Sequence, residues 1–285
     1  MFEINYKSTC AITGSNGYLG SNLCTYLRNN NYKVIELNRK VTNTNTRFYN
    51  LDSTPDKNLL NNVDVLIHCA YDKNLYNINK IREINVYGTD KLFYAATTAG
   101  IKKIIYISSA AAYSGCKSTY GKIKLEIEQI AFKYNALILR PCLIYGNDTA
   151  GIFGRLLKVI NSRNIIPIIG SGNQPMHLVH IDDLCNFLIY YIENIDYKPK
   201  LPITAGYPTS YTLRDIIYNL ALHKKNKPLL IPIPWRIAWI LLKVFELCKF
   251  NFKFSSDNLL GLNYPNTNHD FTINKSIGLT CRPFM

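Results

Sequence analysis

Short apolar runs alternate with stretches of helical periodicity through the first half of the chain. Apolar residues recur every three or four positions over residues 19–30 and 84–100, which predicts two helices, the second ending near Gly100. The apolar runs predict strands over residues 8–14, 32–38, 63–71, 101–110 and 135–146. These runs lack polar alternation, as is typical of a parallel sheet covered by helices on both faces. The pattern therefore predicts an α/β fold with a doubly wound parallel sheet of the Rossmann type.

Beyond Gly146 the pattern becomes less regular. Helices are predicted over residues 152–164 and 181–194, and a tail marked by prolines mixes short elements. We therefore place a dinucleotide-binding domain at residues 1–146. Residues 147–285 are expected to form a smaller, mainly substrate-binding C-terminal part, with some elements returning to the Rossmann core.

Composition narrows the class of protein. Of the 285 residues, 47% are hydrophobic and 18% charged, which excludes a disordered or fibrous chain. The eight cysteines form no C-x-x-C pair and no signal-peptide pattern precedes the first strand, so we expect a reduced, cytoplasmic protein without a metal site. The net charge of +14 is spread without a run of five cations, so no nucleic-acid partner is expected. An anionic substrate or an anionic membrane surface accounts better for the charge.

Three glycines, Gly14, Gly17 and Gly20, lie between the first predicted strand and the first predicted helix. Such glycines allow a tight turn, close approach of a pyrophosphate to the backbone, and close packing of the helix on the sheet. The N-terminus of the helix offers N–H groups and a positive dipole to the phosphates. Because the triplet follows a strand and opens a helix, it predicts a dinucleotide site.

The end of the second predicted strand bears on the choice of cofactor. A carboxylate there would hydrogen-bond the adenosine ribose and repel a 2′-phosphate. Here Asn38 occupies that position, and Arg39 and Lys40 follow it. These residues favour NADP(H) and leave NAD(H) open, since Arg39 could instead be a solvated loop charge.

Seven motifs carry a resemblance to a known family. They are TGSNGYLG (13–20), VDVLIHCAY (63–71), NVYGT (85–89), YISSAAAY (106–113), YGKIK (120–124), LRPCLIYG (139–146) and LVHIDDL (178–184). In this order and spacing they resemble the extended short-chain dehydrogenase/reductase family, in its NAD-dependent epimerase/dehydratase branch that modifies nucleotide sugars. The resemblance covers most of the chain.

The resemblance implies a catalytic set of Ser109, Tyr120 and Lys124. Tyr120 would exchange a proton with the substrate oxygen, and Ser109 would hydrogen-bond that oxygen. A free phenol has a pKa of about 10, which the cation of Lys124 would lower. The cofactor-binding residues that the resemblance implies are Gly14, Asn16, Gly17, Tyr18, Leu19, Gly20, Asn38, Arg39, Asn50, Leu51, Ala70, Asn85, Tyr120, Lys124, Pro141 and Leu143.

Three departures from the family pattern concern the site. Only ten residues separate Ser109 from Tyr120, where many members carry a longer insert. Met176 stands where many epimerases have an arginine for the substrate diphosphate, and a thioether cannot replace that bidentate fork. Asn50 replaces the usual aspartate near the adenine. The chemistry is therefore better defined than the substrate.

The sequence predicts an NAD(P)-dependent oxidoreductase or epimerase acting on a keto or hydroxyl group, with a nucleotide sugar as the expected substrate and a homodimer as an option that the family allows. One alternative is a steroid- or lipid-type dehydrogenase at a membrane surface. The apolar segment 231–254 would serve that role, although we favour a helix packed on the core for it. A second alternative is a non-catalytic protein that senses the cofactor.

Overall fold

The chain folds into two compact units, each described here by itself. The structure is a computed structural model, and it describes residues 5–73, 77–146, 151–194, 196, 201–222, 227–248 and 254–284. The first compact unit, which we call the sheet unit, comprises residues 1–109, 123–141 and 181–204. The second unit comprises residues 110–122, 142–180 and 205–285.

A seven-stranded sheet forms the centre of the sheet unit. The order of its strands is β11 (Ile203–Ala205), β6 (Leu137–Pro141), β5 (Lys103–Ile107), β4 (Val65–His68), β1 (Thr9–Thr13), β2 (Lys33–Asn38) and β3 (Thr46–Phe48). The pairs from β6 through β3 are all parallel. The strand order runs outward in both directions from β1, so the carboxyl ends of β1 and β4 flank the switch point where open α/β sheets bind ligands.

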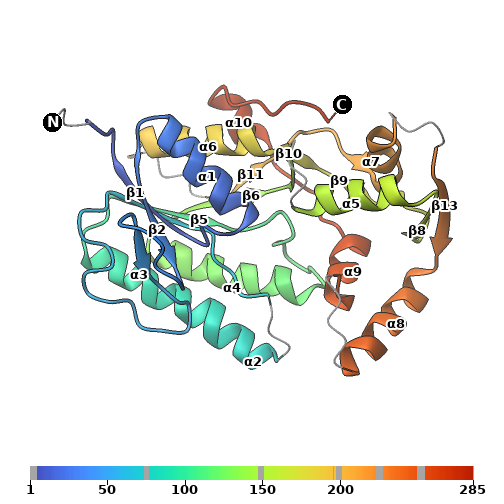
Figure 1. The fold of residues 1–285 in the computed structure, drawn as a ribbon, viewed down its shortest axis with the longest axis horizontal. Coiled ribbons are helices and arrows are strands. Elements are labelled where there is room, and N and C mark those ends of the chain that lie inside the picture. Colours follow the sequence, from blue (N-terminus) through green and yellow to red (C-terminus); the bar gives the residue numbers. More distant parts are fainter. Residues whose placement is uncertain are drawn as a thin grey trace. The chain divides into compact units, whose positions relative to one another are not determined.

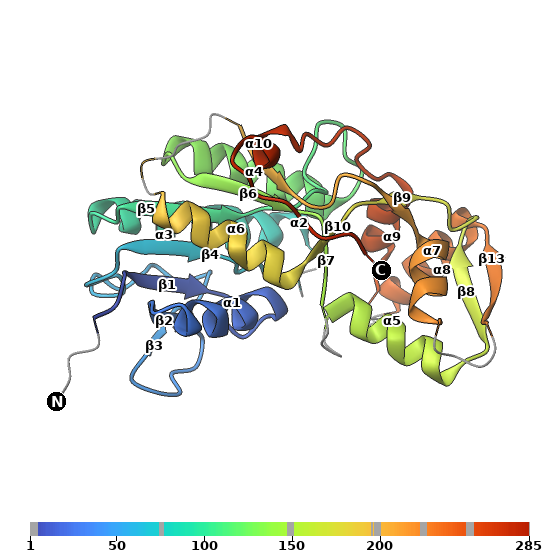
Figure 2. The same cartoon turned by 90° about the horizontal axis from the view of Figure 1, so that it is seen from above.

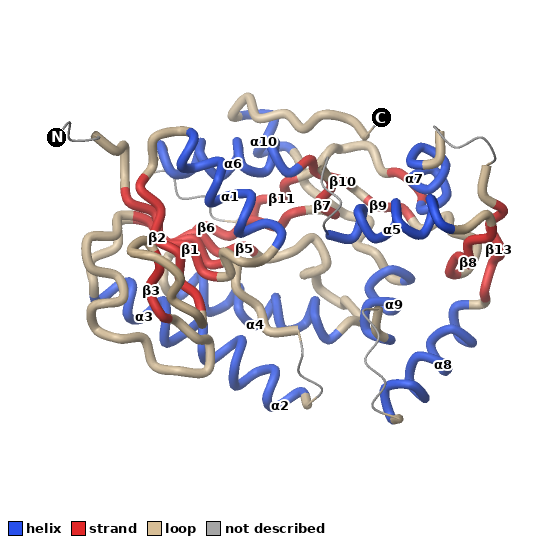
Figure 3. The backbone as a smooth tube through the Cα atoms, viewed as in Figure 1, coloured by secondary structure: helices blue, strands red, loops and turns tan. Residues whose placement is uncertain are grey.

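Helices cover both faces of this sheet. They are α1 (Tyr18–Asn29), α2 (Ile78–Ile81), α3 (Gly88–Thr98), α4 (Thr119–Lys133) and α6 (Ile181–Glu193), with a π-helical turn, η1 (Arg82–Tyr87), between α2 and α3. Helices α1 and α6 lie on one face and α3 and α4 on the other (Figure 1). Figure 2 shows α1 and α6 side by side, and Figure 3 shows the strands in red between the two helical layers. The doubly wound prediction is confirmed.

The predicted strand over residues 135–146 is wrong in one respect, because it is two strands in two sheets. Strand β6 ends at Pro141, whose ring nitrogen has no hydrogen to donate. The N–H of Cys142 then donates to the carbonyl of Ala205 at 2.9 Å, and β7 (Leu143–Tyr145) pairs with β10 (Leu178–His180). The chain therefore leaves the sheet unit at Pro141 and enters the second unit at Cys142.

The second unit is built from short elements. Its helices are α5 (Gly151–Ser162), α7 (Leu213–Leu220), α8 (Trp235–Leu247), α9 (Ser256–Asn263) and α10 (Thr272–Ser276). Besides β7 and β10 its strands are β8 (Ile165–Ile169), β9 (Pro175–Met176), β12 (Tyr211–Thr212) and β13 (Leu229–Ile233). Two small apolar clusters, one around Ile160 and Ile217 and one around Phe153 and Leu178, form its core.

The preferred interpretation of segment 231–254, a helix packed on the core, is wrong for its central part. Helix α8 has no buried residue, and it contacts α9 through the hydrogen bonds of Glu246 with Ser256. Residues 249–253 lie outside the described residues. Within the part of the chain that the structure describes, no helix is both long and apolar enough to cross a bilayer.

Candidate active site

The glycine loop between β1 and α1 has the geometry of a dinucleotide cradle. Gly14 has a φ of +68°, and a Cβ there would come within 3.0 Å of the backbone of Ala70. A Cβ on Gly20 would collide with the carbonyl oxygen of Gly14, so the helix packs closer to the loop than any side chain would allow. Helix α1 begins after Gly17 without a side-chain cap, which leaves its first N–H groups for an anion. This loop therefore fits the pyrophosphate of a dinucleotide.

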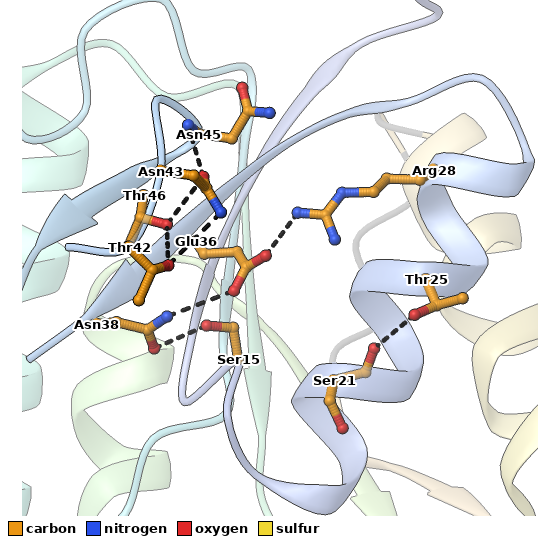
Figure 4. A network of polar contacts seen from close by, with 10 residues as sticks. All are labelled: Ser15, Ser21, Thr25, Arg28, Glu36, Asn38, Thr42, Asn43, Asn45 and Thr46. Atoms are coloured by element: carbon orange, nitrogen blue, oxygen red, sulfur yellow. Dashed lines mark hydrogen bonds and ion pairs between the residues drawn. The ribbon is translucent and has the colours of Figure 1, made fainter. Parts of the chain in front are cut away.

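The end of β2 is fixed to the glycine loop by a polar network (Figure 4). The hydroxyl of Ser15 donates to Oδ1 of Asn38 at 2.7 Å, and both side chains are buried. The carboxylate of Glu36 is held by Arg28 at 2.5 Å and accepts from the amide of Asn38 at 3.4 Å. The end of β2 therefore presents a neutral amide, followed by the exposed Arg39.

A buried histidine links β1 to β4 and α3 beneath this loop. Thr13 Oγ1 accepts the N–H groups of Cys69 and Ala70, both at 3.1 Å, so its own proton points to His68 Nδ1 at 2.7 Å. The hydroxyl of Thr89 donates to the carbonyl of Asn85. It must therefore accept from His68 Nε2, 2.9 Å away. His68 is thus a neutral Nε2–H tautomer, and burial lowers its pKa to about 3.

Asn85 lies in the π-helical turn η1 and is 1% exposed. Its Oδ1 accepts the N–H of Asp72 at 2.7 Å, and its amide donates to the carbonyls of Asp72 and Ile81. These bonds hold the loop after β4, which also carries the half-buried Ala70. A role in cofactor binding stays a prediction for Asn85, and it would act by shaping this loop.

Lys124 lies inside the sheet unit, on α4, and is only 3% exposed. Its Nζ donates to the carbonyl of Ile107 at 2.8 Å and lies 4.9 Å from the ring centroid of Tyr106 and 5.2 Å from that of Tyr71. Burial lowers the pKa of this ammonium to about 7, and Glu128 opposes the shift. The lysine is thus anchored at the carboxyl end of β5.

The two serines that follow β5 have different environments. Ser108 is buried, and its hydroxyl donates to the carboxylate of Glu128 at 2.5 Å. Arg140 donates to both oxygens of the same carboxylate, at 2.8 and 2.6 Å. Ser109 is only half-buried. Ser108 is therefore committed to the network that joins β5, α4 and β6, which agrees with Ser109 as the catalytic serine.

Tyr120 stands in the first turn of α4, and the same continuous helix carries Lys124 one turn later. In the second unit, the N–H groups of Thr119 and Tyr120 donate to the two oxygens of Asp257, at 2.5 and 3.1 Å. The N–H of Gly121 donates to Ser118 Oγ at 3.1 Å. A carboxylate from α9 therefore caps the helix that begins at the proposed acid–base residue.

Asp257 was missed by sequence reasoning. It lies 137 residues after Tyr120, and in the sequence it has the appearance of an ordinary acidic residue in the first turn of its own helix. No local motif marks an aspartate that caps a distant helix.

The remaining predicted residues occupy several environments. Asn16, Gly17 and Arg39 are exposed, Leu51 and Pro141 are buried, and Tyr18, Leu19, Asn50 and Leu143 are half-buried. Met176 lies in β9 opposite Tyr211 of β12, within an apolar cluster, so the absent arginine is replaced by packing. No cluster of three or more potential metal ligands occurs among the described residues.

Comparison with known proteins shows the family of the chain. The sequence model of the NAD dependent epimerase/dehydratase family matches residues 10–204. The chain is 26% identical over 261 residues to UDP-glucose 4-epimerase of Vibrio cholerae, covering 78% of each chain. It is 32% identical over 213 residues to a putative UDP-glucose 4-epimerase of Methanocaldococcus jannaschii, covering 61% of this chain and 70% of that protein.

The fold has counterparts among solved structures. UDP-glucuronic acid 4-epimerase from Bacillus cereus, in complex with UDP-glucuronic acid and NAD, superposes with a TM-score of 0.69 at 21% identity, over 89% of this chain and 97% of that one. The fold and the glycine loop thus define an α/β protein of the dinucleotide-binding type. The chain belongs to the NAD dependent epimerase/dehydratase family, a branch of the extended short-chain dehydrogenases/reductases.

Proposed function

We propose that this protein is an NAD-dependent epimerase of a nucleotide-activated sugar, and that it inverts a secondary alcohol by removing and returning a hydride. The observation that carries the proposal is the placement of Ser109 and Lys124 after β5 and on α4, together with Tyr120 at the start of the same helix. The relatives named as UDP-glucose 4-epimerases support a UDP-hexose as the substrate class.

Each catalytic residue has a defined task in this reaction. Tyr120 takes the proton of the sugar hydroxyl and gives it back to the ketone oxygen, while Ser109 donates a hydrogen bond to that oxygen. Lys124, held at the Ile107 carbonyl, supplies the positive charge that stabilises the phenolate of Tyr120. A nicotinamide cofactor held at the glycine loop would supply the acceptor and donor of the hydride. Hydride return to the opposite face of the ring would give the epimer with no net redox change.

The proposed cofactor is NAD(H). The family description names NAD, and a solved neighbour contains it. The preference for NADP(H) drawn from Arg39 and Lys40 has no support in these relatives. Because the end of β2 presents the amide of Asn38 and no unpaired carboxylate, NADPH remains the cofactor to test against NADH.

The test is epimer formation by the purified protein from UDP-glucose, UDP-glucuronic acid and their N-acetylated amino-sugar counterparts, resolved by chromatography with either cofactor. Tyr120→Phe should lower turnover by about 10²–10⁴-fold while NAD binding is retained. The matched control is Tyr134→Phe, which removes a phenol that donates to Asp90 and should leave turnover unchanged. Equal turnover by Tyr120→Phe and the wild type would show that Tyr120 is not the acid–base residue.

The two alternative functions predict different results in the same experiments. A protein that only senses the cofactor would bind NAD(H) and convert none of the sugars. A lipid-type dehydrogenase would reduce or oxidise a steroid or lipid ketone with net consumption of cofactor, and epimerisation of a sugar would not occur.

A further inference from the structure

Helix α8 exposes a continuous apolar stripe to solvent. Ile237, Ile240, Leu241, Val244 and Leu247, which we call the α8 stripe, are between 49% and 82% exposed. The positions 237, 240, 241 and 244 follow the i, i+3, i+4, i+7 spacing of one helix face. In a helix of a folded domain such a face normally packs on the core. Here contacts with the rest of the second unit lie on the opposite face, where Glu246 accepts from Ser256 and the ring centroids of Trp235 and Tyr264 are 5.8 Å apart.

Charge is distributed around this stripe in an asymmetric way. Helical geometry at 3.6 residues per turn places Arg236 and Lys243 beside Leu247 at one border of the stripe. The acidic residue of the helix, Glu246, lies on the opposite face, where its carboxylate accepts from the N–H and hydroxyl of Ser256 at 2.7 and 2.9 Å. Lys243 Nζ also lies 3.2 Å from Oε2 of Glu246. Because Arg236 and Lys243 outnumber this single carboxylate, the stripe still has a cationic edge.

The sequence around α8 strengthens this bias. Residues 223–253 contain a single acidic residue, Glu246, against seven lysines and arginines: Lys224, Lys225, Lys227, Arg236, Lys243, Lys249 and Lys253. An apolar face with a cationic border is the pattern of a helix that lies in the interface of an anionic bilayer.

We propose that helix α8 docks the protein on the surface of an anionic lipid bilayer, with the α8 stripe inserted at the headgroup boundary. Thirteen residues are too few to cross the membrane, so the helix lies in the plane of the surface. An anionic bilayer satisfies both the apolar stripe and its cationic border. This proposal is independent of the function proposed above.

The test is co-sedimentation of the full chain with vesicles of phosphatidylglycerol and phosphatidylcholine, compared with vesicles of phosphatidylcholine alone. We expect binding to the anionic vesicles and loss of binding as salt rises to about 0.5 M. The double variant Ile240→Glu/Val244→Glu should bind at least ~10-fold more weakly, because two carboxylates would enter the apolar boundary. Arg236→Gln should weaken binding about fivefold, the equivalent of one lost cation near the surface.

The matched control is Val41→Glu/Leu201→Glu, which adds the same charge at apolar positions that are 60% and 64% exposed outside α8. It should bind nearly as well as the wild type. The proposal is overturned if the wild type ignores anionic vesicles, if it binds neutral vesicles equally, or if the α8 variant binds like the control. A concentration-dependent dimer that only the α8 variant dissolves, without vesicle binding, would instead assign the stripe to a second copy of the chain.

Discussion

Two regions of the molecule differ in which side chains they expose to water. Polar groups are buried near the carboxyl ends of the central strands, whereas apolar groups are exposed on helix α8. In the sheet unit, charged and polar side chains such as Glu128, Lys124 and His68 are removed from water, and each has hydrogen-bond partners at fixed positions. On α8, side chains such as Ile240 and Leu247 remain in water although they are apolar. The buried polar groups of the sheet unit keep one another in fixed positions, whereas the apolar side chains of α8 form an exposed surface.

The contrast predicts where substitutions matter. A buried polar group that loses its partner is left with the full cost of its removal from water, whereas an exposed side chain is replaced at little cost to folding. Loss of a buried carboxylate, titration of a buried histidine and loss of a half-buried helix cap should therefore each have a measurable effect.

The largest effect is expected for Glu128→Ala. This carboxylate is 1% exposed, and its removal leaves Arg140 and Ser108 without their acceptor, so unfolding free energy should fall by about 3–5 kcal/mol. Urea denaturation gives the measurement. On the same helix, Glu126 pairs with Arg82 while both side chains are a third or more exposed, and Glu126→Ala should cost less than about 1 kcal/mol. Equal losses of unfolding free energy in the two variants would mean that the buried network stabilises the protein no more than an exposed ion pair does.

The second effect is a pH dependence caused by His68. Its folded pKa of about 3 is far below the unfolded value of about 6.5, so only the unfolded chain takes up this proton as pH falls below 6.5. The contribution to stability is complete above pH 6.5 and is lost progressively toward pH 3. Between pH 7 and pH 5 the wild type should lose roughly 2 kcal/mol through this group. In His68→Gln, which cannot titrate, the denaturation midpoint should depend less on pH; parallel profiles would contradict the assignment.

The smallest effect on stability, with a separate effect on activity, is expected for Asp257→Asn. Weakening a helix cap costs about 1 kcal/mol, and misplacement of Tyr120 should lower kcat about tenfold without changing NAD affinity. Asp215 caps α7 through Thr212 in the same unit, so Asp215→Asn should cost similar stability. It should leave kcat intact, because α7 carries no catalytic residue. If kcat fell in both variants, the effect of Asp257→Asn would come from lower stability and not from the position of Tyr120.

Much of the fold could be predicted because its signals are local. Buried parallel strands are apolar along their whole length, so β1, β2, β4 and β5 were predictable from residues 8–14 and 32–38 and the two later runs. The glycine loop was predictable because a strand, three glycines and a helix occur in one short stretch. The break at Pro141 was not predicted, since the apolar run continues through it and only the partner of each half differs.

The sequence by itself determined the class of fold, the dinucleotide loop and the spacing of Ser109, Tyr120 and Lys124, because these depend on periodicity and on short motifs. Tertiary structure alone decided that Ser108 turns inward to Glu128, that Asp257 caps the helix of Tyr120, and that the apolar face of α8 stays in water. A hydrogen bond between residues 137 positions apart has no periodic signature in the sequence. An apolar helix face likewise has the same residue spacing whether it is buried or exposed. Only the tertiary packing therefore shows whether such a face lies in the core or on the surface.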